Sequence, residues 1–460
     1  MAFIAAVLLC ATYEVGDGKT YASLTDVPWE SLAAGDVVQV HPRAAPYAVK
    51  WAMTRAGVTV RGVPSGSGAL PVITGQGATT RSGQTFANPD RTLVMVAADG
   101  VVLESLHFLR ARQGDAFTAG DGSTGTFASG VSAIDAVAGS NVTIRGCTFE
   151  DLEKGVYVAT DDAVIEGNVF RANRAGGNLD LTGARPVVRF NALRAPTVAA
   201  AENVRDNAAG AVVAYNFIAG GNRLLDIEGI GAPGGDDFLR TRVFGNVLVK
   251  DDFGGNNAVV HFDTQAGPRR LDLYANTIVV RRDLARVVQL AKATVELTLV
   301  NNVVRARPTT NLVMVDGAGD VRYGGNWLQR GRTLTQSGTP LVDLGGNLDG
   351  DDPGFRDELS DDFRLSPSAA VIDRAMMLPS GLDAPAFEFR APAGSAPRGD
   401  DSKPDIGAFE EVVAVVQPDG GAGKVGLVGW RLGCAAAPGQ VVLVLAVMMS
   451  LMRRRRLRSR

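Results

Sequence analysis

The feature that most constrains the fold of this chain is a short segment that recurs through its middle. In each copy, apolar and variable residues alternate, and a residue that is often glycine or aromatic then precedes an asparagine and a further apolar residue. VIEGNVF (164–170), VVRFNAL (187–193) and VVAYNFI (212–218) are three consecutive copies. Successive asparagines lie 21 to 30 residues apart. The eight asparagines are Asn168, Asn191, Asn216, Asn246, Asn276, Asn302, Asn326 and Asn347.

Each copy has the pattern of a short β-strand followed by a sharp corner. Alternation with a period of two is typical of a strand, and asparagine tolerates the left-handed backbone conformation of a tight corner. Asparagines stacked coil upon coil hydrogen-bond to one another and satisfy backbone amides. Cys147 and Leu106 occupy the asparagine position in two earlier copies. The repeat predicts an all-β, single-domain right-handed parallel β-helix with an asparagine ladder and about 13 coils.

A second strand is predicted after each corner, as in GVYV (155–158), RLLDIEG (223–229) and AVVHFDT (258–264). Apolar and polar residues alternate in these segments, so the two sets lie on opposite faces of the strand. The residues expected to point inward are Val156, Leu181, Ile227, Phe262, Leu290 and Val315. The residues expected on the outer face are Tyr157, Asp180, Thr182, Asp226, Glu228, His261, Asp263, Gln289 and Asp316, with Arg205 and Lys292 nearby.

The composition excludes several classes of protein. With 46% hydrophobic and 21% charged residues, the chain has the make-up of a globular protein rather than a disordered one. Six arginines lie within residues 453–460, so the rest of the chain is more acidic than the net charge of -3 indicates. An acidic body does not suit a nucleic-acid partner. The three cysteines lie far apart and allow no disulfide framework, so the stability of the body must come from packing. We expect the protein to be a monomer.

The two ends of the chain are predicted to direct it to the cell surface. Residues 1–12 hold an apolar run that ends in small residues, as in a signal peptide, although no basic residue precedes it; a buried first strand is the alternative. Residues 413–433 form a glycine-rich linker. Residues 434–460 contain an apolar run of 12 residues, too short as a helix for a hydrocarbon core of about 30 Å, and then the arginine cluster. The positive-inside rule keeps that cluster in the cytoplasm and places the body outside.

Segment 434–460 also resembles the C-terminal sorting tails of myxobacterial type, which combine a Gly-Cys pair, a brief hydrophobic helix and an arginine cluster. The resemblance implies that a sorting protease processes the chain and that Cys434 is the lipid-attachment point. The protein would then be exported and held at the outer membrane or cell envelope. A plain C-terminal tail anchor in the membrane is the alternative.

The body, residues 13–412, resembles bacterial right-handed β-helix repeat proteins with the fold of the pectate-lyase (pectin-lyase-like) superfamily. Residues 13–42, followed by VTVRG (58–62), are similar to their first coil, and residues 351–373 with KPDIGAFE (403–410) are similar to the terminal coil of related surface proteins. For the polysaccharide lyases of this superfamily, the resemblance implies a groove across one strand face. There a cation neutralises a uronic acid carboxylate, and Lys, Arg or His abstracts the C5 proton.

Four ionisable residues are predicted to form a compact patch. Asp226 and Glu228 share one face of a strand, and His261 and Asp263 take the equivalent positions one coil later, about 5 Å away. Calcium takes carboxylate oxygens, so Asp226, Glu228 and Asp263 are candidate Ca²⁺ ligands; paired carboxylates could instead hydrolyse a glycosidic bond. Arg240 is the first cation after Glu228 and completes the candidate catalytic set, since the lysine expected in alginate and chondroitin lyases is missing. The candidate substrate-binding residues are Tyr157, Asp180, Arg205, Gln289 and Lys292.

Two functional hypotheses follow. In the first, an exported, surface-anchored β-helix protein binds polysaccharide along a side groove and processes it as a lyase or glycoside hydrolase. In the second, the solenoid is a rigid spacer of a non-catalytic surface or adhesion protein, and the outward charges merely keep a strand face soluble. The fold does not decide between them.

Overall fold

The computed structural model describes residues 10–229, 236–264, 268–307, 311–399 and 402–412. The chain divides into two units, Met1–Val413 and Ala414–Arg460, and every described residue belongs to the first. The predicted linker, the predicted sorting tail with Cys434 and most of the signal-like segment lie outside the described residues. None of the described helices has the length and apolar character needed to cross a membrane.

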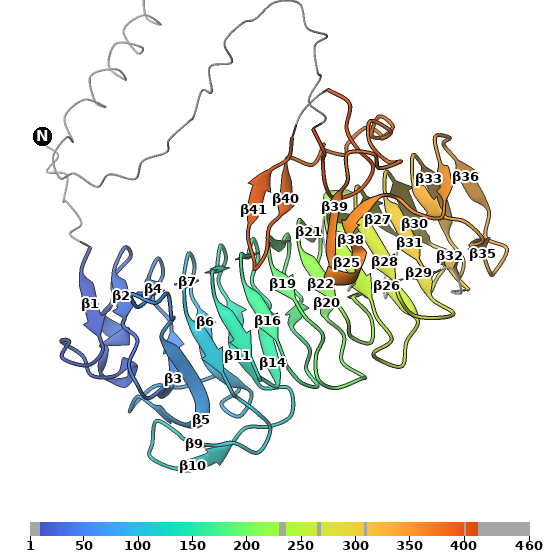
Figure 1. Cartoon of the computed structure of the whole chain (residues 1–460). Helices are drawn as coiled ribbons and strands as arrows, with labels where there is room; N and C mark the ends of the chain where they lie inside the picture. Colours follow the sequence, from blue (N-terminus) through green and yellow to red (C-terminus); the bar gives the residue numbers. More distant parts are fainter. Residues whose placement is uncertain (1–9, 230–235, 265–267, 308–310, 400–401, 413–460) are drawn as a thin grey trace, which may run out of the picture. The chain divides into compact units, whose positions relative to one another are not determined.

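The described chain winds into a right-handed parallel β-helix whose coils supply strands to three long sheets, here called A, B and C (Figure 1). Sheet A contains 13 strands, one for each coil, as the repeat predicts. Its strands are β1 (Thr12–Val15), β2 (Val37–Val40), β4 (Thr59–Gly62), β7 (Val102–Glu104), β12 (Thr143–Arg145), β15 (Val164–Glu166), β18 (Val187–Arg189), β21 (Val212–Ala214), β24 (Arg240–Phe244), β27 (Arg269–Tyr274), β30 (Val295–Val300), β33 (Asp320–Gly324) and β36 (Leu341–Asp343).

Sheets B and C follow sheet A in each coil. Sheet B consists of β5 (Val72–Thr80), β8 (His107–Leu109), β13 (Thr148–Glu150), β16 (Val169–Arg171), β19 (Ala192–Leu193), β22 (Phe217–Ala219), β25 (Val247–Lys250), β28 (Thr277–Val280), β31 (Val303–Ala306), β34 (Trp327–Gln329) and β37 (Leu348–Gly350). Sheet C consists of β6 (Thr92–Ala97), β11 (Ser132–Ala138), β14 (Lys154–Val158), β17 (Leu179–Leu181), β20 (Val204–Asp206), β23 (Leu225–Ile227), β26 (Ala258–Phe262), β29 (Arg286–Leu290), β32 (Val313–Asp316) and β35 (Thr333–Thr335). Strand β3 (Tyr47–Met53) pairs with β5 and then β6, and so links the two sheets.

Apart from four strands of the C-terminal segment, the remaining described elements are short. They are the hairpin of β9 (Ala116–Thr118) and β10 (Thr124–Thr126) and the 3-10 helices η1 (Leu24–Asp26), η2 (Trp29–Ser31), η3 (Asp236–Leu239) and η4 (Glu358–Ser360).

The predicted asparagine ladder occupies the corner between sheets A and B. The Asn168 side-chain amide donates to Oδ1 of Asn191 at 3.0 Å. The same bond joins each asparagine to the next as far as Asn347. The backbone N–H of Cys147 donates to Oδ1 of Asn168 at 2.9 Å, so Cys147 takes the asparagine position, as predicted. The ladder satisfies the polar groups of a corner that is closed to water.

The interior contains the predicted inward residues of sheet C. All six are at most 3% exposed, and they are Val156, Leu181, Ile227, Phe262, Leu290 and Val315. One member of this column departs from the apolar pattern, because Asp206 pairs in register with Leu181 and Ile227. Burial raises the pKa of the Asp206 carboxyl to about 6, although the Ala208 N–H and Arg269 favour its charged form. Asp206 is therefore a buried acid inside the solenoid.

The C-terminal segment does not form the expected terminal coil. Its strands β38 (Phe355–Asp357) and β39 (Asp362–Leu365) form one antiparallel hairpin, and β40 (Phe387–Phe389) and β41 (Ser395–Pro397) form another. These hairpins lie along the side of the solenoid (Figure 1). Apolar residues of sheet B point outward there, and Phe363, Phe389 and Phe409 cover them in one cluster with Phe217. The C-terminal segment therefore buries apolar side chains on the outer face of sheet B, which would otherwise form an exposed apolar patch. The coil repeat alone does not predict this contact.

Candidate functional site

The polar outer positions of sheet C form one continuous row. Each pairs in register with the next across neighbouring coils, from β11 to β32, so that successive members lie one strand spacing apart, about 4.8 Å. The sequence prediction that the outer residues of successive coils share a face is therefore confirmed for Tyr157, Asp180, Asp226, His261, Gln289 and Asp316. In order along the row they are Asp135, Tyr157, Asp180, Arg205, Asp226, His261, Gln289 and Asp316.

Asp226 and His261 form the centre of this row. Nδ1 of His261 lies 2.7 Å from Oδ1 of Asp226, and the Arg223 guanidinium donates to the same oxygen at 2.7 Å. Asp226 is 1% exposed and His261 is 8% exposed. Outer strand positions are usually solvated, so the burial of this carboxylate is a departure from the predicted polar face. A buried charge needs partners, and here an imidazole and a guanidinium supply them.

The surroundings of Asp226 keep it ionised. Burial alone would raise the pKa of its carboxyl group, but the hydrogen bond with His261 and the positive charges of Arg223 and Arg205 lower it further than burial raises it. The net result is a pKa below the ordinary value. An ionised carboxylate only accepts hydrogen bonds, so Nδ1 of a neutral His261 carries the proton. Nε2 is then the basic nitrogen of the ring.

Glu228 joins the pair from the end of β23. One ligand atom each from Asp226, Glu228 and His261 can be chosen so that all three lie within 4.8 Å of one another. Oδ2 of Asp226 is buried and has no hydrogen-bond partner within the described chain. The three side chains are therefore close enough to hold one cation, and one buried oxygen is available for it.

This set of donors fits calcium poorly. Ca²⁺ takes six to eight oxygen ligands, whereas this cluster offers carboxylates from Asp226 and Glu228 and then an imidazole. Asp263, the third predicted Ca²⁺ ligand, is not part of the cluster. It accepts the Thr264 N–H at 2.6 Å and lies 3.7 Å from Nζ of Lys292. Calcium binding stays a prediction of the sequence.

Arg240 lies away from the cluster, contrary to its predicted place in the catalytic set. It begins β24 of sheet A, where it pairs in register with Arg270 and forms an ion pair with Asp272. Strand β23 belongs to sheet C and strand β24 to sheet A, so the next cation in the sequence after Glu228 lies on a different sheet. The cation beside Asp226 is instead Arg223, which precedes the strand.

The predicted substrate-binding residues lie on the row or at its edge. Tyr157 is half-buried and accepts a hydrogen bond from the Thr182 hydroxyl at 3.2 Å. Asp180 forms an ion pair with Lys154 at 2.7 Å. Arg205 is 46% exposed in its side chain and lies 3.4 Å from Glu202. Gln289 is half-buried. Lys292 is exposed and donates to the Thr264 carbonyl.

Sequence reasoning missed Arg223, Lys154 and Asp135. Arg223 lies in a turn, outside the alternating pattern, although its position three residues before Asp226 could have drawn attention to it. Asp135 lies at the head of the row, 5% exposed, and its Oδ2 accepts the Thr92 hydroxyl at 2.6 Å. Burial raises its pKa, and the Thr92 hydrogen bond with the charges of two lysines offsets this only in part.

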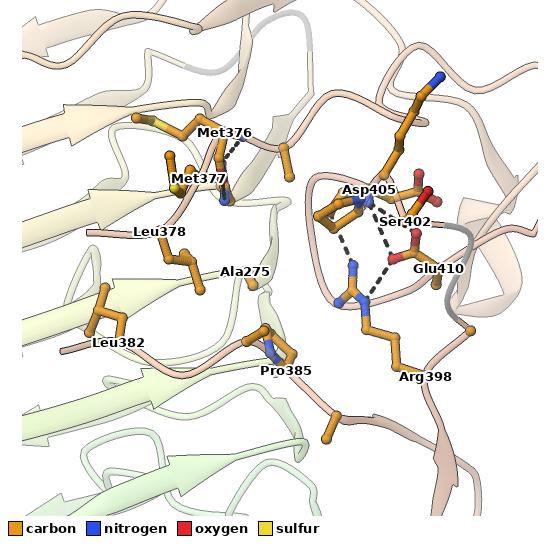
Figure 2. Close-up of a pocket in the computed structure, with 17 residues that line it drawn as sticks. Ala275, Met376, Met377, Leu378, Leu382, Pro385, Arg398, Ser402, Asp405 and Glu410 are labelled. Carbon is orange, nitrogen blue, oxygen red and sulfur yellow. Dashed lines mark hydrogen bonds and ion pairs between the residues drawn. The ribbon is translucent and has the colours of Figure 1, made fainter. Parts of the chain in front are cut away.

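A separate cavity of about 740 Å³ lies where the C-terminal segment meets the solenoid (Figure 2). Met376, Leu378 and Leu382 form an apolar wall, and Arg398 and Glu410 form a polar wall across from it. Burial raises the pKa of Glu410 to about 6, and Arg398 donates to it at 2.8 Å. Arg398 also donates to backbone carbonyls of the same segment, so this pair stabilises the C-terminal fold. None of the residues that line this cavity belongs to the cluster of Asp226, Glu228 and His261 on sheet C.

No protein-family model matches the chain, and no curated protein sequence matches it. Among solved structures, it is similar to the crystal structure of the pectate lyase Pel9A, with 11% identity, a TM-score of 0.45 and coverage of 88% of this chain and 98% of that chain. It is also similar to a DFA-IIIase from Arthrobacter chlorophenolicus A6 in complex with DFA-III, with 14% identity, a TM-score of 0.41 and coverage of 69% and 76%. A third is the GH136 lacto-N-biosidase from Eubacterium ramulus, with 13% identity, a TM-score of 0.42 and coverage of 73% and 68%. Similarities at these scores do not indicate the function of this chain.

Proposed function

We propose that this protein binds acidic polysaccharide along the outer face of sheet C and cleaves it by β-elimination at His261. The observation that carries the proposal is the 2.7 Å contact between His261 Nδ1 and the buried carboxylate of Asp226. A carboxylate that holds Nδ1–H leaves Nε2 as a base, the arrangement that general base catalysis uses. The row of polar side chains on either side provides contacts at the spacing of successive coils.

Each residue of the site has a distinct part in this reaction. Arg205, next to Asp226 in the row, binds the uronate carboxylate and stabilises the negative charge that develops beside it. Nε2 of His261 takes the C5 proton, the bond between C4 and its oxygen breaks, and a C4–C5 double bond forms. The departing oxygen takes a proton from Glu228 or water. Asp226 is a positioning residue, because it touches His261 rather than substrate.

Elimination suits the geometry better than hydrolysis by the carboxylate pair. A carboxylate that acts as nucleophile must reach the sugar, yet Asp226 is 1% exposed and is bonded to His261 and Arg223. An inverting pair needs carboxyl groups about 6.5–9.5 Å apart so that water fits between them. Atoms of Asp226 and Glu228 lie within 4.8 Å. The two arginines also offset the acidic charge that would otherwise repel a uronate.

The test is incubation of the full-length protein with polygalacturonate, alginate, chondroitin and hyaluronan, and with neutral xylan and dextran. New ultraviolet absorbance from unsaturated uronate ends reports elimination, and new reducing ends report any cleavage. We expect both signals with at least one acidic polymer and neither with the neutral polymers. Reducing ends without the ultraviolet signal would indicate hydrolysis. An absence of both cleavage and binding would favour the rigid-spacer hypothesis.

His261→Ala is the variant for this site, and His107→Ala is the matched control. His107 lies on sheet B, 3.0 Å from Glu150, so it has a similar acidic partner outside the row. Loss of a general base lowers turnover by about 100- to 10,000-fold. We expect that loss for His261→Ala and unchanged turnover for His107→Ala. Equal turnover in the two variants would place the base elsewhere.

We also propose that the protein is exported and anchored at the cell surface through residues 434–460, with Cys434 as the processing and lipid-attachment point. The support is the order of small residues, apolar run and arginine cluster in the sequence. Deletion of 434–460 should release the protein from the cell surface. Mass spectrometry of the native protein should find no peptide from the arginine cluster, and recovery of an intact C-terminus would leave a plain tail anchor.

A further inference from the structure

We propose that Asp226, Glu228 and His261 form a binding site for a divalent transition metal such as Zn²⁺, in preference to calcium. This concerns the same site as the proposed function, but it rests on the donor atoms and not on any polysaccharide. The ion takes the place of the proton on Nδ1 of His261, the ring nitrogen that faces Asp226, so the zinc-bound site and the metal-free site that performs β-elimination are alternative states. One donor atom from each residue lies within 4.8 Å of the other two. From that spacing, small movements of the side chains bring three protein atoms around one ion at coordination distances of about 2 Å.

The buried oxygen of Asp226 is a second, independent indication of a ligand. Oδ1 is bonded to both His261 and Arg223, whereas Oδ2 is buried and finds no hydrogen-bond partner within the described chain. The residue is 1% exposed, so water does not readily satisfy that atom. A buried carboxylate oxygen without a partner is costly, and a bound cation removes the cost.

The imidazole decides which cation fits. Calcium and magnesium are hard ions that prefer oxygen, whereas imidazole nitrogen suits zinc, copper, iron and nickel. Two carboxylates and one histidine form a three-ligand set, which leaves a position of a tetrahedral ion open to water or substrate. Arg223 donates a hydrogen bond to Oδ1 of the carboxylate and orients it, as partners of metal-binding carboxylates commonly do.

The experiment is a calorimetric titration of the chelator-treated full-length protein with ZnCl₂, and separately with CaCl₂, in the absence of any glycan. We expect one zinc ion per chain and calcium affinity at least 100-fold weaker. His261→Ala and Glu228→Gln should each weaken zinc binding by 100-fold or more, since each removes one ligand. His107→Ala, which removes the histidine beside Glu150, should bind zinc as the wild type does. Thermal unfolding of each metal-free variant checks that it is folded.

Several results would overturn the inference. They are calcium affinity equal to or above that of zinc, zinc affinity unaffected by His261→Ala, and no zinc binding by a folded protein. Cobalt supplies a second readout, because Co²⁺ bound in a four-coordinate protein site has strong visible absorption bands, which loss of the imidazole ligand in folded His261→Ala should shift or abolish. Wild-type protein without such bands would count against the site. Polysaccharide cleavage that persists in chelator while zinc fails to bind would leave the proposed function standing and refute the metal site alone.

Discussion

Asp135 and Asp226 lie four coils apart on the same row of sheet C, and both are buried carboxylates with one oxygen that lacks a hydrogen-bond partner within the described chain. Their pKa values nevertheless move in opposite directions. Burial raises that of Asp135 and outweighs the Thr92 hydrogen bond and the charges of Lys154 and Lys50. Burial also acts on Asp226, but the His261 hydrogen bond and nearby arginines outweigh it.

The difference shows that position on a repeat does not determine what a residue does. Both aspartates occupy the same register position on their coils, and both are buried. Asp226 has a direct hydrogen bond to an imidazole and an arginine 2.7 Å away, whereas the close partner of Asp135 is the Thr92 hydroxyl. The pKa of one carboxyl is thereby lowered next to an imidazole, and the pKa of the other is raised by burial. Opposed environments of this kind separate a reactive centre from a structural acid.

The largest effect that we expect is a difference in turnover between the variants of the two aspartates. Asp226→Asn should lower turnover of the acidic polysaccharide by about 100- to 10,000-fold, because an amide no longer holds Nδ1–H of His261 and the ring loses its orientation. Asp135→Asn should change turnover less than fivefold. The loss should appear in kcat more than in KM, with an altered pH profile. Similar losses for both variants would show that the row acts as one site and the comparison is wrong.

The next effect concerns the buried lysine of each region. Lys50, beside Asp135, has its pKa lowered to about 7 by burial; Lys250, beneath the turn before Arg223, has its pKa lowered to about 8 by burial and nearby arginines. Folding therefore favours the neutral amine. Stability from Lys50 is absent below about pH 7 and rises as the pH increases toward the unfolded pKa near 10.4.

The measurement is the free energy of unfolding in urea at pH 7 and pH 9.5 for the wild type, Lys50→Met and Lys250→Met. The wild-type value should rise by about 2–4 kcal/mol from Lys50, and Lys50→Met should abolish that rise. Lys250→Met should remove a smaller increment. If the free energy of unfolding of both variants rises between pH 7 and pH 9.5 as much as that of the wild type, neither amine is neutral in the folded protein.

The smallest effect compares the stability of the two aspartate variants. A lowered pKa gives Asp226 a stabilising contribution above its unfolded pKa that is lost as the pH falls through the folded value. A raised pKa gives Asp135 the opposite sign, since its ionisation at neutral pH costs stability. Asp226→Asn should therefore cost about 1–3 kcal/mol at pH 7 and less at pH 3.5. Asp135→Asn should be nearly neutral at pH 7 and more destabilising at pH 3.5. The same trend in both variants would remove the electrostatic distinction.

The contrast also shows what the sequence could predict. The asparagine ladder, the inward column and the shared face of the outer row all follow from periodicity, because every coil imposes the same backbone geometry on residues such as Asn246 and Ile227. Burial of Asp226 and its bond to Arg223 depend on the turn before β23. Turns differ in length from coil to coil, so their side chains have no period. Without that information the sequence predicts Arg240 in the patch, whereas the structure places it on sheet A.

The central claim is that an ionised Asp226 holds Nδ1–H of His261 and leaves Nε2 as the base. The chain has three histidines, so ¹⁵N-histidine labelling of chelator-treated protein gives a spectrum in which His261→Ala identifies the ring of interest. We predict that the neutral ring of His261 carries its proton on Nδ1, and that Asp226→Asn shifts it toward the Nε2–H tautomer that neutral histidine prefers in water. A neutral His261 already protonated on Nε2, and unchanged by Asp226→Asn, would contradict the account.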